Sequence, residues 1–556
     1  MSDQVVVDRQ EGAQMPESVP SGKSSFRHDP VVLLDGETSL PRNILGNKGY
    51  GINAMRREGL PVPPAFCITT EVCAHYFDDP DSTTAAIRDE VRDKLRWLEA
   101  ETSRTFGSGP RPLLVSVRSG AALSMPGMLD TVLDLGIDDG VEAALAELHT
   151  PEFAADTRKR FCHMYRRIVL DDDGEVPNDP LAQLGGAIGA VFRSWNSPRA
   201  IAYRKHHGLS QLGGTAVVVQ AMVFGNMDAK SGTGVLFSRN PMTGANEPFG
   251  EWLLRGQGED VVSGTFDVEP LSALHTAQPA VYDELVAAAD KLERIAADVQ
   301  DIEFTVEQGK LWLLQTRVAK RSAQAAVRLA LAFRGEGLID DVETLRRVSP
   351  AEVKTLLQPS LQPETRLAAP LLAKGLPACP GVVSGTAYTD VDDAIDAAEE
   401  DQDVILVRVS TSPDDIQGMM AARGIVTEIG GATSHAAVVS RELHRPAIVG
   451  CGAGFAKSLA GKQITIDGTE GEVREGILEL TAWSEDDSPD LAALSAIARE
   501  HSPLRAHASG DYEALHDDNE AGVGAAIAAG VTDVVSEHPL ITMLIAIRLQ
   551  DNATDN

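Results

Sequence analysis

The sequence has few basic residues for its size and no long apolar run. Lysine and arginine together number 49, against 82 aspartates and glutamates, so the formal net charge is −33 at pH 7. Nucleic acids and anionic membranes are bound through clustered lysine and arginine side chains, so we expect neither as a partner. No apolar run reaches the ~18 residues of a membrane span, and we predict none.

Cysteine is also scarce. The five cysteines are odd in number and without the spacing of a metal site, at positions 67, 73, 162, 379 and 451. We therefore expect neither a disulfide framework nor a structural zinc site. We expect a reduced, cytoplasmic protein. Residues 1–30 are polar and lack the apolar core of an export signal, which predicts a disordered leader.

The chain does have enough length, 556 residues, for two to four domains with substantial cores. Its 43% hydrophobic and 24% charged content is typical of a globular protein. Strand-like and helix-like segments alternate, which predicts an α/β multidomain fold. We expect a first unit at 31–330, a helical connector and proline-rich linker at 331–368, a second α/β unit at 369–481, and an acidic linker with a tail at 482–556.

Glycine-rich loops in the first unit indicate a nucleotide site. The loops "GNKGYG", "RSGAALSMPGM" and "KSGTG" match no common phosphate-binding motif, and each alone is equally well explained as a turn. Lys48 and Arg118 lie in or beside them and could neutralise phosphate charge. Asp301 and Glu303, in "DIEF", alternate on a predicted strand and share one face, which suits Mg²⁺ but also a solvated surface.

One histidine stands in an unusual context. His435 follows the small residues "GGATS" and opens the helix-like stretch "HAAVVSREL", with Thr433 and Ser434 as candidate N-caps. The positive end of a helix favours a neutral, nucleophilic imidazole and an anion bonded to it, which suits acceptance of a phosphoryl group. A half-buried histidine on a strand–turn–helix connection would have the same local pattern.

Longer motifs occur in an order that resembles pyruvate, phosphate dikinase over residues 31–480. "GTGVLFSRNPMTG" and "DIEFTVEQGKLWLLQTRVAKRSAQAAV" are similar to the family's ATP-grasp nucleotide domain. "GIVTEIGGATSHAAVVSRELHRPAIVG" is similar to its swivelling phosphohistidine domain. The resemblance implies ATP and phosphate as substrates and Mg²⁺ as cofactor. It also implies that a histidine attacks the β-phosphorus of ATP, AMP leaves, and phosphate takes the γ-phosphoryl to give pyrophosphate.

The resemblance implies a role for each candidate residue. His435 and Arg317 would be catalytic. The other implied positions are the ATP-phosphate ligands Lys48 and Arg118, the loop residue Gly127, the nucleotide-placing Gln315, and the magnesium ligands Asp301 and Glu303. Thr433 matches a regulatory phosphothreonine position of the plant enzymes, although we favour a helix-cap role for it here.

The sequence also departs from the family pattern. Asn47 replaces a glycine, Ile429 stands where an arginine is usual, and Ala432 replaces a methionine. The tail around residues 503–548 resembles the first strand–helix–strand of the family's pyruvate-binding barrel. There Val535 replaces the substrate-binding arginine, and the barrel's metal ligands and catalytic cysteine are absent. We expect the tail to be a short TIM-barrel remnant or a docking surface, because one such unit closes no barrel.

Three functions remain open. The chain could be a dikinase-like phosphotransferase that phosphorylates His435 and passes the group to pyruvate on a separate barrel protein, or to another acceptor. It could be a small-molecule phosphotransferase of the rifampin phosphotransferase kind, although no acceptor domain is evident. It could also be a catalytically weak, ATP-binding regulatory protein. Homodimerisation, as in barrel-bearing relatives, stays open too.

Overall fold

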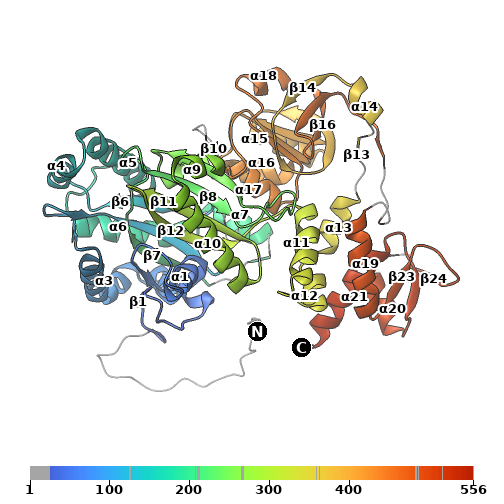
Figure 1. Cartoon of the computed structure of the whole chain (residues 1–556), viewed down its shortest axis with the longest axis horizontal. Helices are drawn as coiled ribbons and strands as arrows, with labels where there is room; N and C mark the ends of the chain where they lie inside the picture. Colours follow the sequence, from blue (N-terminus) through green and yellow to red (C-terminus); the bar gives the residue numbers. More distant parts are fainter. Residues whose placement is uncertain are drawn as a thin grey trace.

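The computed structural model describes residues 26–554, except 124, 126, 207, 210–212, 264–267, 358–359, 362, 482–484, 486–487 and 516. Residues 1–25 of the predicted leader therefore lie outside the described residues. The chain forms an α/β multidomain structure, with a large N-terminal region, a second α/β domain above its edge, and a tail beside the connector helices (Figure 1). None of the helices in the described part is both long and apolar enough to cross a membrane.

Two five-stranded sheets form the N-terminal region. The first is ordered β1 (Val31–Leu33), β2 (Ala65–Ile68), β7 (Thr215–Ala221), β5 (Val115–Ala121) and β6 (Thr131–Leu135). The second is ordered β10 (Glu269–Pro270), β9 (Phe249–Leu254), β8 (Gly232–Phe237), β11 (Gln300–Glu307) and β12 (Lys310–Val318). All seven residues of β7 are buried, which explains why its sequence, TAVVVQA, lacks the polar alternation of a half-exposed strand.

Helices surround these sheets. They are α1 (Arg42–Arg57), α2 (Thr70–Asp78), α3 (Pro80–Thr102), α4 (Asp139–Leu148), α5 (Pro151–Val169), α6 (Pro180–Ser194), α7 (Pro198–His206), α8 (Gly258–Ser263), α9 (Leu271–Ala277) and α10 (Pro279–Ala296), with a small sheet of β3 (Thr105–Phe106) and β4 (Pro112–Leu113). Apolar periodicity in the sequence predicts amphipathic helices over 280–296 and 319–334, and α10 confirms the first. The one predicted over 319–334 begins later, at Ala323, because the Ser322 hydroxyl caps it by accepting the Ala325 N–H.

Gly46 determines how α1 meets the first sheet. Its φ of 67° interrupts the helix, and a Cβ there would lie 1.7 Å from the Gly120 carbonyl oxygen on β5. Only glycine permits so close an approach. The contact places Lys48, two residues further along α1, above the strand that carries Arg118.

The second domain is built on an eight-stranded sheet. Its order is β14 (Leu371–Lys374), β21 (Glu472–Glu475), β20 (Gln463–Asp467), β16 (Val382–Tyr388), β17 (Val404–Arg408), β18 (Gly424–Thr427), β19 (Ala447–Val449) and β15 (Leu376–Cys379). The strands from β16 to β19 are parallel, and the helices are α15 (Val391–Glu399), α16 (Ile416–Ala421), α17 (His435–Glu442) and α18 (Phe455–Leu459).

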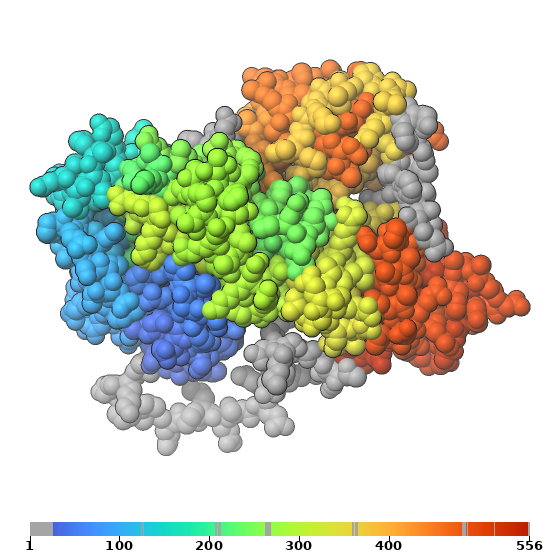
Figure 2. All heavy atoms as spheres, in the orientation of Figure 1, coloured from blue at the N-terminus to red at the C-terminus, as the bar shows by residue number. Residues whose placement is uncertain are grey.

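The connector comprises α11 (Ala323–Gly335), α12 (Asp341–Arg346), α13 (Pro350–Leu356) and α14 (Pro363–Ala368). Two short paired strands, β13 (Ser360–Leu361) and β22 (Leu480–Thr481), join the chain entering the second domain to the chain leaving it. In Figure 2 the tail, in red, lies against the yellow connector helices and below the second domain.

The tail is larger than the single strand–helix–strand predicted. It contains α19 (Pro489–His501), β23 (Arg505–His507), β24 (Glu513–Ala514), α20 (Glu520–Ala528), β25 (Asp533–Val535) and α21 (Pro539–Thr554). Its three parallel strands, ordered β23-β25-β24, form an open sheet. Its apolar side chains share a core with α11–α13 of the same chain, so the tail packs on the body; Val535 and Val531 are only partly buried.

Candidate active site

The predicted nucleotide residues gather on neighbouring strands. In the β11–β12 register, Asp301 lies opposite Arg317 and Glu303 opposite Gln315, so all four project from one short stretch of sheet. The Arg118 guanidinium donates to Glu303 at 2.7 Å and to Gln315 at 3.2 Å. These contacts bring together residues nearly 200 positions apart in sequence, as the nucleotide-site prediction required.

A cavity of about 940 Å³ opens beside this cluster. Lys48, Arg118, Gly127 and Glu303 line it, as does the Pro413 turn of the second domain. Its volume is in the range of pockets that hold small-molecule cofactors. Asp301 and Arg317 are not part of its lining. Arg317 instead pairs with Asp301 at 2.7 Å and lines a second, smaller cavity.

Burial and charge perturb the groups of this cluster. Desolvation, followed by repulsion from Arg118, lowers the pKa of Lys48 to about 7, although some of the side chain still meets solvent in the cavity. For Glu303 burial acts to raise the pKa, but Arg118, Arg317 and Lys48 outweigh it and hold the pKa below its usual value. For Asp301 burial prevails over Arg317, and the pKa is raised.

The two carboxylates form a donor set that fits Mg²⁺. Hard oxygen ligands from one or two carboxylates, completed by phosphate oxygens, are what this ion prefers in nucleotide sites. Each carboxylate accepts from an arginine, Glu303 from Arg118 and Asp301 from Arg317. A bound metal would compete with those arginines, which could then donate to phosphate oxygens.

His435 is the first residue of α17, as predicted. Its Nδ1 lies 3.1 Å from the Thr411 hydroxyl, and its buried Nε2 has no hydrogen-bond partner among the described residues. Burial lowers the pKa of this ring to about 4, against a smaller opposing effect of Asp415. The ring is therefore neutral at pH 7, as predicted, but burial is the chief cause rather than the helix end invoked from sequence. One ring nitrogen is left as a free nucleophile.

Gly127 brings the two domains together at this histidine. With a φ of 70°, it adopts a backbone conformation that favours glycine, and a Cβ there would lie 3.3 Å from both Cδ2 and Nε2 of His435. The loop therefore allows the ring to lie directly against the edge of the nucleotide cavity, which Gly127 also lines.

The helix-cap role predicted for Thr433 is wrong. Ser434 occupies the N-cap position, with no side-chain capping bond, and the Thr433 hydroxyl contacts the Glu251 carboxylate of β9 instead. The same carboxylate accepts from the backbone N–H of Ala432 at 2.6 Å and of Thr433 at 3.1 Å. Thr433 is buried by this contact, and nothing in the geometry bears on its predicted regulatory role.

Glu251 also explains why one of the small residues before His435 is a glycine. A Cβ on Gly431 would lie 2.2 Å from a Glu251 carboxylate oxygen, so glycine at this position makes room for an acidic side chain. Sequence reasoning missed Glu251, because its partners lie 180 residues away and no local spacing connects them.

Further contacts hold the second domain against the first. Lys320 pairs with Glu442 at 3.0 Å, the Tyr203 hydroxyl donates to the same carboxylate, and Arg199 lies 3.5 Å from Asp414. Apolar side chains from both domains form one continuous core behind His435, including Met128, Trp195, Ile416, Ala436 and Val439. The phosphohistidine candidate is thus docked at the nucleotide cavity in this structure.

Comparisons with known proteins agree with this arrangement. Residues 83–281 match the family model "Pyruvate phosphate dikinase, AMP/ATP-binding domain", and residues 400–471 match "PEP-utilising enzyme, mobile domain". The chain therefore combines an ATP-binding domain with a mobile domain of the PEP-utilising enzymes. In these two domains it is similar to the pyruvate, phosphate dikinases.

Individual relatives show how much of each chain is matched. The chain is 39% identical over 503 residues to pyruvate, phosphate dikinase of Clostridium symbiosum, covering 80% of this chain and 57% of that protein. It is 41% identical over 504 residues to the Rhizobium meliloti (strain 1021) protein, covering 78% and 56%. The chain thus spans a little over half the length of these relatives. A solved Enzyme I structure matches 14% of this chain and 31% of its own, with 33% identity and a TM-score of 0.12.

Proposed function

We propose that this chain is a dikinase-type phosphotransferase whose carrier is His435. Nε2 of the neutral ring attacks the β-phosphorus of ATP, the bond between the α- and β-phosphates breaks, and AMP leaves. Inorganic phosphate then takes the γ-phosphoryl as pyrophosphate, which leaves one phosphoryl on His435. The observation that supports this best is the unpartnered Nε2, held against Gly127 at the edge of the nucleotide cavity.

The chain's own residues have distinct tasks in this proposal. Lys48 and Arg118 line the cavity and bind the phosphates, with Gln315 orienting Arg118. Thr411 fixes the ring through Nδ1, so Nε2 is presented to the cavity. Arg317, close enough to Lys48 to perturb it, stabilises the charge of the transferring group. Mg²⁺, held by Glu303 and Asp301, would neutralise phosphate charge when bound.

The phosphoryl then passes to pyruvate on a separate barrel protein, or to another acceptor. The transfer requires the mobile domain to leave its docked position, and its two connections are joined only by the two-residue strands β13 and β22. All five cysteines are unpaired, which supports the reducing cytoplasm that we propose as the compartment.

Incubation with Mg²⁺, phosphate and ATP labelled at the β-phosphorus tests the carrier. We expect AMP, pyrophosphate and an acid-labile label on the protein, because a phosphoramidate hydrolyses in acid whereas a serine or threonine ester survives. His435→Ala should abolish the label, and the control His163→Ala, at an exposed position of α5, should retain it. ADP as the sole product would contradict the proposal.

A catalytically weak, ATP-binding regulatory protein is the second candidate. It is favoured by Ile429, which stands beside the carrier loop without the charge of the usual arginine. Nucleotide binding without any label on His435 would support this candidate instead. The rifampin phosphotransferase alternative gains no support, since only α11–α14 and β13 lie between the ATP-binding region and the mobile domain in the described residues.

A further inference from the structure

A second cavity, of about 350 Å³, lies between the docked domains. Its walls come from α1, from the end of β12 and the segment that follows, from α13, and from the C-terminal end of α17. Two carboxylates line it, Glu352 and Glu442, against five cationic side chains: Arg42, Arg317, Lys320, Arg321 and Arg441. A concentration of cations is unusual in a chain that carries a net charge of −33.

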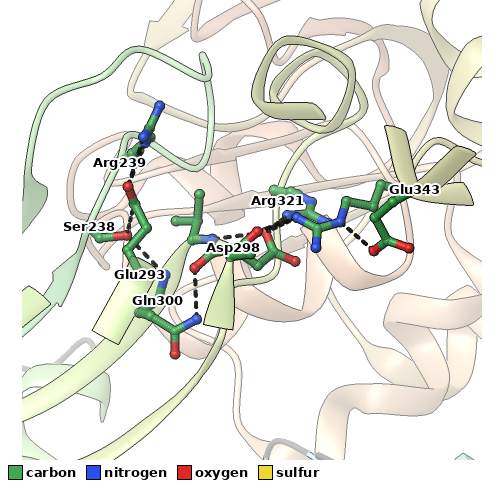
Figure 3. A network of polar contacts seen from close by, with 10 residues as sticks. Ser238, Arg239, Glu293, Asp298, Gln300, Arg321 and Glu343 are labelled. Atoms are coloured by element: carbon green, nitrogen blue, oxygen red, sulfur yellow. Dashed lines mark hydrogen bonds and ion pairs between the residues drawn. The ribbon is translucent and has the colours of Figure 1, made fainter. Parts of the chain in front are cut away.

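Both carboxylates in the lining already have partners. Glu352 accepts from the backbone N–H and the hydroxyl of Ser349, at 2.6 and 2.7 Å, in the capping box of α13. One oxygen of Glu442 accepts from Lys320 and Tyr203, while its other oxygen is buried without a partner. Arg321 pairs with Asp298, outside the lining (Figure 3). Arg317 likewise pairs with Asp301, so the cations of the lining that have no carboxylate partner among the described residues are Arg42 and Arg441.

Arg441 is the most exceptional of the cations. Its side chain is 1% exposed, and it has no carboxylate within ion-pair distance among the described residues. Its two terminal nitrogens donate to the carbonyls of Ala378 and Ala432, at 3.2 and 3.1 Å, but its Nε has no partner. Burial lowers the pKa of this guanidinium to about 10. The carboxylates of Asp301 and Glu251 act on this cation only from beyond ion-pair distance. Its burial is therefore costly, and an anion in the adjoining cavity would offset that cost.

A second unpartnered group lies in the same lining. Nδ1 of His444 is buried and has no hydrogen-bond partner among the described residues. The ring could donate from this nitrogen to an anion. Arg441 and His444 belong to the mobile domain, whereas Arg42 and Arg321 belong to the ATP-binding region and its extension. The cavity is therefore complete only while the domains are docked.

Apart from Arg317, which lines this cavity, the residues assigned to the carrier site lie outside its lining. Arg441 lies on α17, six residues beyond His435, which at 1.5 Å per residue is roughly 9 Å along the helix. On α1, Lys48 lines the nucleotide cavity and its neighbour Asn47 lines this one. An anion bound here would not occupy the position of a group on His435.

We propose that this cavity binds a phosphate-class oxyanion, either inorganic phosphate or pyrophosphate, and thereby stabilises the docked arrangement of the two domains. The site binds the anion only when both walls are present, so the anion shifts the equilibrium toward docking by its difference in affinity between the two arrangements. The binding does not depend on phosphoryl transfer to His435.

Calorimetric titration of the full chain tests the site. The nucleotide cavity is first saturated with a non-hydrolysable ATP analogue, and pyrophosphate or phosphate is then added, with sulfate as a comparison. We expect one anion per chain whose binding depends on Arg42, in addition to phosphate that binds beside the analogue as the proposed substrate. The affinity of the Arg42-dependent site for each ligand decides between the two sources. Arg42→Met should weaken binding about 5-fold or more, the scale of losing one charge contact. The same charge change at the exposed Arg88 of α3 should have no effect. Absence of binding, or equal affinity in both variants, would overturn the proposal.

Two further variants separate this site from the carrier and test the need for docking. His435→Ala should bind the anion as the parent does, even though it cannot be phosphorylated, so the failure of one proposal leaves the other standing. Glu251→Ala removes the carboxylate that holds the mobile domain, and it should weaken anion binding several-fold although every cavity residue is retained. Unchanged affinity in Glu251→Ala would show that the site is not shared between domains.

Discussion

Gly431 and Glu251 make the tightest fit between the two domains at the residue scale. Gly431→Ala would place a Cβ 2.2 Å from the Glu251 carboxylate, which three hydrogen bonds hold in place. We expect this substitution to slow labelling of His435 by about 10-fold or more, since small displacements of a reacting group are costly. Rapid-quench measurement of the labelling rate provides the value.

The double variant gives this prediction its control. In a Glu251→Ala background the obstructing carboxylate is absent, so Gly431→Ala should cost much less than it does in the parent. Such non-additivity is expected of residues in direct contact. Equal effects in the two backgrounds would mean that Gly431 acts through its backbone alone.

Lys48 provides a prediction about pH. Its pKa of about 7, set by burial and then by Arg118, means that the free protein carries a largely neutral amine at pH 8. Phosphate groups stabilise the charged form, so nucleotide binding should take up a proton above pH 7 and take up little below pH 6. Calorimetry in buffers of different ionisation enthalpy measures this uptake.

The matched variants are Lys48→Met and Lys159→Met. The first should abolish proton uptake at pH 8 and weaken ATP binding, whereas the second, at an exposed position of α5, should alter neither. Proton uptake that persists in Lys48→Met would assign the titration to another group and refute this interpretation.

At the scale of elements, local patterns predicted most strands and the helix over 280–296, because β-branched runs and apolar periodicity are local properties. Sequence did not predict where Thr433 points, since its partner Glu251 lies in another domain. Sequence also did not predict the helix α21. Alternation along β11 did predict that Asp301 and Glu303 lie on one face of the strand.

The tail gives a prediction at this scale. Leu544, on α21, is 1% exposed in the core shared with α11–α13. Leu544→Ala should destabilise the tail by about 2–5 kcal/mol, the usual cost of emptying a buried leucine site. Leu367→Ala, at a position that is 82% exposed, should change stability by less than about 0.5 kcal/mol. Urea unfolding followed by hydrogen exchange measures both, and similar effects would contradict the packing of the tail.

For the molecule as a whole, docking determines which half of the proposed dikinase reaction this chain would perform. His435 faces the nucleotide cavity, and the only other large unit among the described residues is the tail with its open three-stranded sheet. Formation of phosphoenolpyruvate requires a metal to hold the enolate oxygen and a group to move the methyl proton. The half-buried Val535, at the end of β25, supplies neither charge nor a proton.

We therefore expect phosphorylated His435 to persist when the pure chain is mixed with pyruvate. The label should leave only when a barrel-bearing dikinase is added whose own carrier histidine has been replaced by alanine, because that protein offers a pyruvate site but no competing carrier. Coupled detection of phosphoenolpyruvate, together with the loss of label, measures the transfer between the two chains. Rapid phosphoenolpyruvate formation without the added protein would contradict this division of labour, since the described residues would then have to contain a pyruvate site near the docked or swung position of His435.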